Sequence, residues 1–414
     1  MRILFAPETF NLGETSRAVE VARAVRDAGH EVRFMGYSRR FADHITSAGF
    51  DLELLDPELS EADADRLIAV DQGRAIRHPF TTSMIRERVR SEPALIERWQ
   101  PHVIVIGTTL SLFISARAAH VPLVYVRPLA MSRGHLTSMT TFPLVMARGG
   151  LGSAVNRLAG TATRTAATAL RWKPRSFRVV AAERGVRLPD RTVDALDADV
   201  NLIVSAWPVP SSKLADNEHL VGPVYARTDG ELPAELLEFE DRRRPVVYVG
   251  LGSSARRSSA RSILGRLAPM DIDIVTTAGR YLTDDDRASL PANIRVYDFL
   301  PAHQLVGLID ASVIHGGEGT VQTACASGAP FAGIGLQPEQ RFNLDECARF
   351  GNALRFSTSD VRRRRLPGLV ERRLHDEGMR QAARVLADRI RDLDGAAVSA
   401  AHIIDLARET APDH

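Results

Sequence analysis

The chain has 414 residues, of which 44% are hydrophobic and 25% are charged, and its formal net charge at pH 7 is +2. This length exceeds what a single hydrophobic core usually supports, so we expect two domains. The composition is that of an ordinary globular protein, and the small net charge gives no reason to expect a polymeric nucleic acid as a partner.

The chain enters a strand-like run at residues 2–6, with no leader-type sequence before it. Its longest apolar stretch, residues 103–116, is interrupted by polar residues and is too short to span a bilayer. We therefore expect a cytoplasmic protein without a transmembrane segment. Cys325 and Cys347 fit neither a disulfide framework nor a zinc site, and we expect both in the core.

The first half of the chain alternates strand-like and helix-like segments. In the helix-like segment 15–28 the apolar residues recur on one face, and Gly29 ends it. Strand-like runs lie at residues 2–6, 31–35, 103–106 and 123–126. This βαβ order predicts a parallel, doubly wound sheet.

The same order begins again at Pro245, after a stretch rich in proline and acidic residues that is typical of a linker. The second set of strand-like runs lies at residues 246–250, 272–276, 294–297, 312–314 and 331–334, with a helix-like segment at 259–267. A last helix-like segment covers residues 396–408. The sequence therefore predicts an N-terminal domain at 1–206, a linker at 207–244, a C-terminal domain at 245–390 and a terminal helical segment at 391–414.

The most informative stretch begins where the strand-like run 311–314 leads into two glycines and then into a helix-like segment, 320–327. Glycines at such a turn let backbone N–H groups approach a ligand, and the helix N-terminus adds about half a positive charge. Together they suit a phosphate or a diphosphate. The residues that form this turn, including two flanking donors, are His315, Gly316, Gly317 and Thr320.

A carboxylate and an amide, Glu339 and Gln340, follow the next strand-like run. This pair suits the hydroxyls of a sugar, because one side chain accepts hydrogen bonds and the other both donates and accepts. The whole spacing resembles the donor-sugar signature of the UDP-glycosyltransferase superfamily, the inverting family 1 enzymes with the GT-B fold. The matching residues are His315, Gly316, Gly317, Thr320, Gly328, Pro330, Glu339 and Gln340. The alternative is a glycine-rich turn in an ordinary α/β domain.

The resemblance implies two Rossmann-like, doubly wound domains that face each other across a cleft, with the terminal segment 391–414 packing back on the N-terminal domain. It also implies an inverting, metal-independent transfer from a nucleotide diphosphate sugar of the UDP or dTDP type to a small acceptor, in bacterial secondary metabolism. The nucleotide sugar would be a co-substrate, and no cofactor or metal is expected. The Asp-x-Asp triplets at 63–65 and 197–199 do not adjoin the donor motif, and we interpret them as solvated surface acids.

Two further segments match the donor site of the family. Ser253 and Ser254 lie in a Gly-Ser-Ser turn near the expected diphosphate, although the same residues also fit a dinucleotide-binding pattern or a simple turn. Phe299 and Leu300 stand where the family places the nucleobase, with a core phenylalanine as the alternative. Thr323 replaces the glutamate that plant members use for the ribose.

The acceptor side departs from the family. Gly13-Glu14 stands where the family has Gly-His, and Thr108 follows the strand after which the family has an aspartate. Three interpretations remain open: Glu14 is the base, the acceptor is already ionised and needs no base, or the chain is an inactive relative. Glu14 also fits a simple helix N-terminal acid, and Glu8 is a lesser candidate for the base. We assign Gly13 and Thr108 to acceptor binding.

Residues 127–182 contain no acidic residue and are rich in arginine. This pattern favours an anionic acceptor bound by Arg127 and Arg133, since guanidinium binds phosphate and carboxylate bidentately. The alternative is a solvated basic helix face. The main hypothesis is thus a glycosyltransferase; the rivals are a catalytically inactive auxiliary protein that activates a partner enzyme, and a nucleotide-sugar epimerase.

Overall fold

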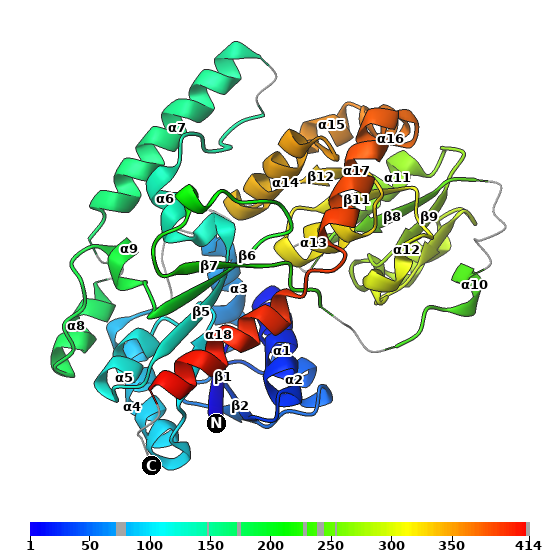
Figure 1. Cartoon of the computed structure of the whole chain (residues 1–414). Helices are drawn as coiled ribbons and strands as arrows, with labels where there is room; N and C mark the ends of the chain where they lie inside the picture. The colour runs from blue at the N-terminus through cyan, green and yellow to red at the C-terminus, as the bar shows by residue number, and fades with distance from the viewer. Residues whose placement is uncertain are drawn as a thin grey trace. The chain divides into compact units, whose positions relative to one another are not determined.

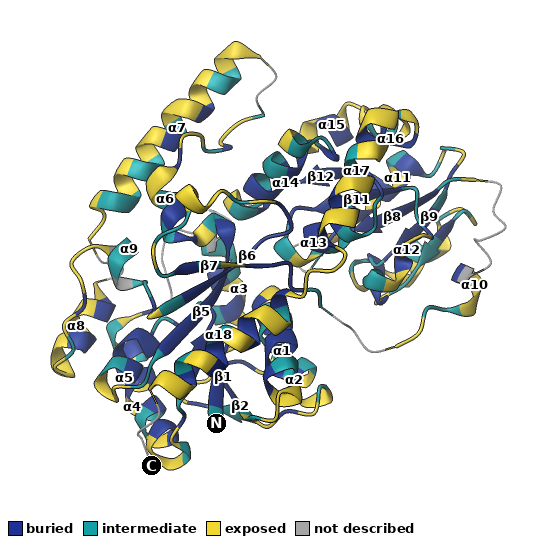
Figure 2. Ribbon diagram, viewed as in Figure 1, coloured by how far each residue is buried: buried dark blue, intermediate teal, exposed yellow. Residues whose placement is uncertain are grey.

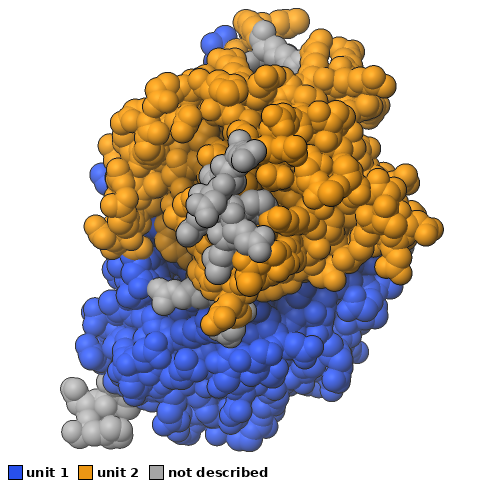
Figure 3. All heavy atoms as spheres, turned by 90° about the vertical axis from the view of Figure 1, so that its right-hand side faces the viewer, with its two compact units in different colours: residues 1–142, 154–224, 394–414 blue, residues 143–153, 225–393 orange. Residues whose placement is uncertain are grey.

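The computed structural model describes residues 1–71, 80–146, 149–171, 175–226, 230–237, 244–252 and 255–410. These residues divide into two compact units (Figure 3). Unit 1 comprises residues 1–142, 154–224 and 394–414, and unit 2 comprises residues 143–153 and 225–393. Each unit contains one parallel β-sheet (Figure 1), which confirms the predicted pair of Rossmann-like domains.

The sheet of unit 1 has seven strands in the order β3-β2-β1-β4-β5-β6-β7, and every neighbouring pair is parallel. The strands are β1 (Arg2–Ala6), β2 (Glu31–Gly36), β3 (Leu52–Leu54), β4 (Val103–Ile106), β5 (Leu123–Pro128), β6 (Val200–Val204) and β7 (Glu218–Gly222). The strand β7 lies inside the stretch 207–244 that the composition suggests as a linker. It pairs with β6 and so extends the sheet of unit 1 by one strand.

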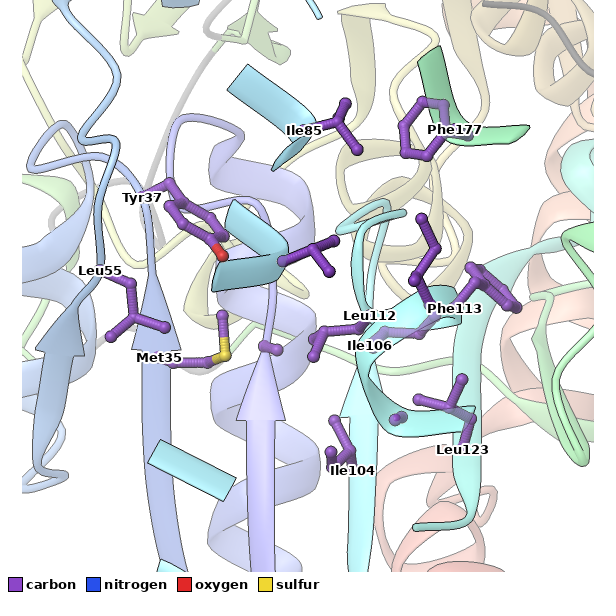
Figure 4. Close-up of a cluster of buried hydrophobic side chains, with 14 of the residues drawn as sticks. Met35, Tyr37, Leu55, Ile85, Ile104, Ile106, Leu112, Phe113, Leu123 and Phe177 are labelled. Carbon is purple, nitrogen blue, oxygen red and sulfur yellow. The ribbon is translucent and has the colours of Figure 1, made fainter. Parts of the chain in front are cut away.

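Alternate residues of the unit 1 strands enter two separate cores, one on each face of the sheet. Ile3 and Phe5 of β1 point to the face covered by α1 and α18, whereas Leu4 and Ala6 point to the face covered by α4, α5 and α8. Figure 4 shows part of the second core, and Figure 2 shows that the strands are mostly buried. The period of two along each strand and the apolar residues on both faces explain the continuous apolar runs in the sequence.

The last helix, α18, packs on α1 and contributes Ala400, Ile403 and Ala407 to the core of unit 1. This confirms that the C-terminal helix returns to the N-terminal domain. The helical segments that complete unit 1, with the start of α7 assigned to unit 2, are α1 (Leu12–Asp27), α2 (Ala42–Ser47), α3 (Glu61–Asp71), α4 (Thr82–Trp99), α5 (Leu112–Ala118), η1 (Leu129–Met131), α6 (Arg133–Ser138), α7 (Gly150–Ala169), α8 (Ser176–Glu183), α9 (Thr192–Ala195), η2 (Ser211–Lys213) and α18 (Gly395–Glu409).

The sheet of unit 2 has six parallel strands in the order β10-β9-β8-β11-β12-β13. The strands are β8 (Val246–Gly250), β9 (Asp273–Thr276), β10 (Ile294–Val296), β11 (Ala311–His315), β12 (Phe331–Ile334) and β13 (Ala353–Arg355). The helical segments are α10 (Ala234–Leu237), α11 (Arg257–Leu267), η4 (Gly279–Tyr281), α12 (Asp284–Ala288), η5 (Ala302–Leu305), α13 (Glu318–Ala326), α14 (Pro338–Phe350), α15 (Thr358–Arg362), α16 (Leu366–His375) and α17 (Glu377–Ile390).

The cysteines lie in neighbouring helices of unit 2, Cys325 on α13 and Cys347 on α14. Both are buried as free thiols, as expected from the sequence. Across the described ranges of the chain, no helix combines the length and the apolar character needed to cross a membrane.

Candidate functional site

The strand order of each sheet reverses at one position, and the predicted site residues gather beside these two positions. In unit 1 the chain runs outward in both directions from the neighbours β1 and β4, and in unit 2 from the neighbours β8 and β11. Ligands of open α/β sheets bind beyond the carboxyl ends of the strands at such a reversal. Glu14 and Thr108 follow β1 and β4, and the glycine turn follows β11.

The glycine turn joins β11 to α13 as predicted, and Gly317 is the N-cap residue of α13. Gly317 has no side chain that could cap this helix, whereas α14, the next helix along, begins with a reciprocal capping box. Backbone N–H groups in the first turn of a helix have no partner within the helix. The first turn of α13 therefore offers donors, together with the positive end of the helix dipole, to an anion.

The His315 imidazole lies between two glycines that come from different loops. A β-carbon on Gly252 would lie 2.0 Å from its Cε1 atom, and one on Gly317 would lie 2.4 Å from its Nε2 atom. Burial lowers the pKa of His315 to about 4, and the backbone of Gly250 offsets this only in part. The imidazole of the ligand-free protein is therefore neutral at pH 7, so it can serve a diphosphate as a hydrogen-bond donor but not as a standing positive charge.

Glu339 and Gln340 occupy the first turn of α14, and the structure engages both. Gln340 is buried, and its Oε1 atom accepts hydrogen bonds from the N–H groups of Leu336 (2.9 Å) and Gln337 (3.3 Å). Glu339 accepts a hydrogen bond of 2.8 Å from Nδ2 of Asn343, which also donates to the carbonyl oxygen of Gly316 at 3.0 Å. Asn343 thus connects the Glu339 carboxylate to the glycine turn.

The sequence reasoning did not select Asn343. Asn343 lies four residues after Glu339 and therefore on the same face of one helix. This spacing could have identified it as a partner of Glu339.

The remaining donor candidates differ in exposure. The Phe299 side chain is 52% exposed, which suits a stacking surface and speaks against the core alternative, whereas Leu300 is buried. Thr320 is half-buried in the first turn of α13, and the Thr323 hydroxyl donates within the same helix to Gly319. Ser253 and Ser254 lie outside the described residues.

In unit 1 the structure brings Glu14 and Thr108 together. Oε2 of Glu14 accepts from the N–H groups of Thr108 (2.9 Å) and Glu8 (3.3 Å), and Oε1 accepts from the Thr108 hydroxyl at 2.6 Å. A β-carbon on Gly107 would lie 2.2 Å from Oε2, so the carboxylate requires glycine there. Gly13 is exposed, and its N–H donates to the N-cap residue Asn11. Glu14 therefore connects the loops after β1 and β4.

Glu8 belongs to a buried polar cluster that the sequence did not reveal. Its carboxylate forms an ion pair of 2.5 Å with Arg88, and both side chains are 1% exposed. Burial raises the pKa of Glu8, while the charge of Arg88 and its hydrogen bond lower it. The guanidinium also lies 3.8 Å from the centre of the Tyr37 ring, whose hydroxyl donates to Glu92 at 2.8 Å. A buried carboxylate so paired is poorly placed to act as a general base.

The two arginines assigned to the acceptor are both engaged in ion pairs. Arg127 is buried and pairs with Glu218 at 2.9 Å. Arg133 pairs with Asp194 and Asp197, each at 3.0 Å. Both arginines are thus paired with carboxylates from later in the chain, and neither is an unpaired anion site. The surface interpretation of Asp197 was wrong for the same reason, since its side chain is 13% exposed and is paired with both arginines.

Comparisons with known proteins agree with this geometry. Residues 261–395 match the family described as the C-terminal domain of erythromycin biosynthesis protein CIII-like proteins. The chain is 26% identical over 399 residues to a PGL/p-HBAD biosynthesis rhamnosyltransferase of Mycobacterium bovis, and the alignment covers 94% of this chain and 84% of the relative.

Two solved structures resemble the chain over nearly its whole length. The spinosyn forosaminyltransferase SpnP gives a TM-score of 0.69 at 20% sequence identity, with 99% of both chains covered. The glycosyltransferase VinC in complex with dTDP gives a TM-score of 0.70 at 19% identity, with 99% of this chain and 100% of VinC covered. These likenesses establish the fold.

The two doubly wound domains and the likeness to solved glycosyltransferase structures give the chain the GT-B fold. The chain is similar to the family 1 glycosyltransferases. It is a glycosyltransferase of the type found in natural-product and glycolipid biosynthesis.

Proposed function

We propose that this enzyme is an inverting, metal-independent glycosyltransferase that uses a nucleotide diphosphate sugar of the UDP or dTDP type and a small acceptor. The observation that carries the proposal is the turn between β11 and α13. There a glycine backbone, a helix N-terminus without a capping side chain and a neutral imidazole meet. Such a turn stabilises a diphosphate as it departs, because its donors are already oriented. The complex of VinC with dTDP supports a nucleotide diphosphate as the ligand.

In this proposal the diphosphate, the nucleobase and the sugar of the donor are bound by different residues. The first turn of α13 with Thr320 holds the diphosphate, Phe299 stacks on the nucleobase, and Glu339 accepts hydrogen bonds from the sugar hydroxyls. An acceptor oxygen attacks the anomeric carbon as the bond from that carbon to the diphosphate oxygen breaks. The nucleoside diphosphate leaves with the electron pair, and a single displacement inverts the configuration at the anomeric carbon.

The acceptor proton goes to Glu14 if the acceptor is a neutral hydroxyl. A carboxylate offers about four acceptor positions. Three of them are used by Glu8 and Thr108, which leaves Oε1 with capacity for one more hydrogen bond. For an acceptor that is already ionised no base is needed, and Glu14 then only connects the two loops. Because Arg127 and Arg133 are paired, they do not argue for an anionic acceptor.

Thermal unfolding in the presence of UDP, dTDP, GDP and ADP tests the donor site. A ligand that binds only the folded protein stabilises it by about 2.7 kcal/mol at a hundredfold excess over Kd. We expect UDP or dTDP to raise Tm selectively. Stabilisation by none of the four nucleotides would contradict the proposal.

A matched pair of variants assigns the nucleobase contact. Phe299→Ala removes a ring that is 52% exposed, and Val306→Ala removes a side chain of the same segment that is 48% exposed. Neither change opens a core cavity. Loss of base stacking costs about 1–3 kcal/mol, so Phe299→Ala reduces the nucleotide-induced shift while Val306→Ala keeps it. An equal effect of both variants would exclude Phe299 as the stacking residue.

Product analysis then separates the enzyme from its two rivals. Transfer or hydrolysis of the stabilising sugar nucleotide by the purified chain excludes an inactive auxiliary protein. A donor that returns with one inverted sugar carbon would indicate an epimerase instead.

A further inference from the structure

Gly252, which follows β8, is held close to His315 by a side chain that the donor motif does not include. Gly252 has a φ angle of +61°, a conformation that glycine adopts without strain. The His315 ring lies so close to Gly252 that no side chain fits at this position. The backbone of Gly252 therefore forms one wall around the imidazole.

The hydroxyl of Tyr281 donates a hydrogen bond to the carbonyl oxygen of Gly252. Tyr281 ends η4, which follows β9, so this bond joins the loop after β8 to the neighbouring strand connection. Burial raises the pKa of the Tyr281 phenol, which keeps its proton in place at neutral pH. The Tyr281 hydroxyl therefore remains a hydrogen-bond donor to Gly252 at neutral pH.

The segment η4 is itself fixed at the end of β10. The N–H group of Gly279 donates to the carbonyl oxygen of Tyr297 at 3.0 Å. A β-carbon on Gly279 would lie 2.5 Å from Oδ1 of Asp298, so η4 sits directly on this connection. A continuous series of contacts therefore connects the segment before Phe299 with η4, and Tyr281 of η4 with Gly252 beside His315.

We propose that Tyr281 is a positioning residue that holds Gly252 over His315 and thereby fixes the diphosphate-binding turn. The effect of Tyr281 on catalysis rests on the proposed function. The hydrogen bond from Tyr281 that holds Gly252 beside His315, here called the clamp, is a property of the ligand-free protein. Without the hydroxyl, the loop after β8 moves away from His315. Water then reaches the imidazole, and the donors that face the diphosphate lose their fixed spacing.

The test uses Tyr281→Phe, which keeps the ring and removes the hydroxyl. The matched control is Tyr248→Phe, because the Tyr248 hydroxyl also makes a hydrogen bond in unit 2, to the Thr277 hydroxyl at 3.1 Å. The pH titration of His315 is followed by NMR on protein with labelled histidines, with the resonance assigned by its loss in His315→Asn. In Tyr281→Phe the pKa of His315 rises toward the ordinary value of about 6.5. In Tyr248→Phe it keeps the wild-type value.

Nucleotide affinity supplies the second readout. One hydrogen bond contributes about 0.5–1.5 kcal/mol, which corresponds to a weakening of UDP or dTDP binding by a factor of about 2–13 in Tyr281→Phe. With a sugar nucleotide as substrate, kcat/KM for the donor falls in Tyr281→Phe, because the hydrogen-bond donors that stabilise the departing diphosphate are no longer held in place. An unchanged His315 pKa in Tyr281→Phe, or equal changes in both tyrosine variants, would overturn the proposal. If the wild type binds no nucleotide, the donor assignment fails, and the titration still decides whether the clamp exists.

Discussion

The connection between Glu14 and Thr108 makes a quantitative prediction about stability. Thr108→Val removes the hydroxyl that donates to Oε1 of Glu14 at 2.6 Å and keeps the N–H group that donates to Oε2. A hydrogen bond to a charged group contributes about 1.5–3 kcal/mol. Glu14→Ala removes the shared acceptor altogether and leaves the N–H groups of Glu8 and Thr108 without it, which costs about 1–3 kcal/mol for each donor.

We therefore expect Thr108→Val to lower the free energy of unfolding by about 1.5–3 kcal/mol in the wild-type background. In the Glu14→Ala background the same substitution costs almost nothing, because the partner of the hydroxyl is already gone. The exposed Thr137, whose hydroxyl donates to carbonyl groups of its own helix, is the control, and Thr137→Val changes stability by less than about 0.5 kcal/mol.

Tryptophan fluorescence in denaturant suits this measurement. The three tryptophans of the chain all fall in the residue ranges of unit 1, so the signal follows the unit that contains Glu14. If Thr108→Val costs the same with and without Glu14, the two side chains are not coupled. The described bond would then contribute nothing to the loop connection.

Three further predictions concern buried ionisable groups and the metal dependence of nucleotide binding. Arg88→Met leaves Glu8 buried without its cation and lowers the stability of unit 1 by about 3–5 kcal/mol, part of which Glu8→Gln restores; a variant of wild-type stability would contradict the pairing. His315 has a folded pKa of about 4 against about 6.5 unfolded. The contribution of the His315 imidazole to the free energy of unfolding is complete above pH 6.5 and is lost as the pH falls through 4. This loss amounts to about 3 kcal/mol. Calorimetry should therefore show that the stability difference between wild type and His315→Asn shrinks by that amount on acidification, and a difference that stays constant with pH would contradict this. EDTA leaves the nucleotide-induced rise in Tm unchanged if binding is metal-independent, and a loss reversed by Mg²⁺ would refute that.

The sequence predicted the strands best where apolar residues run without interruption. Four strands, β1, β4, β8 and β12, have the predicted bounds, because a strand buried on both faces has no polar positions to blur its ends. Four strands were not predicted, namely β3, β6, β7 and β13. β7 carries Glu218 and His219, and the buried Glu218 carboxylate pairs with Arg127 from β5. A pairing between residues 91 positions apart leaves no local pattern in the sequence.

The same distinction explains how far the candidate site could be predicted. The donor turn is one contiguous motif between a strand and a helix, so its sequence is sufficient to place it. The acceptor side depends on pairs that are distant in the chain. Glu14 meets Thr108 across 94 positions, and Glu8 meets Arg88 across 80. Charge counting over residues 127–182 did not include Asp194, Asp197 and Glu218, which come later in the chain and pair with Arg127 and Arg133.

The contact between Glu14 and Thr108 also explains why the family's histidine and aspartate are absent together. A carboxylate at position 14 only accepts hydrogen bonds, so position 108 must donate, and a threonine does so through both its hydroxyl and its N–H group. An aspartate there would face Glu14, and two carboxylates about 4 Å apart repel by about 4 kcal/mol at an effective dielectric constant of about 20. Thr108→Asp should therefore destabilise unit 1 strongly, whereas Glu14→His combined with Thr108→Asp recovers stability, because the imidazole can donate to the new carboxylate. Tryptophan fluorescence in denaturant measures the stability of both variants. If Thr108→Asp is tolerated in the presence of Glu14, the two positions are independent and this account of the missing pair is wrong.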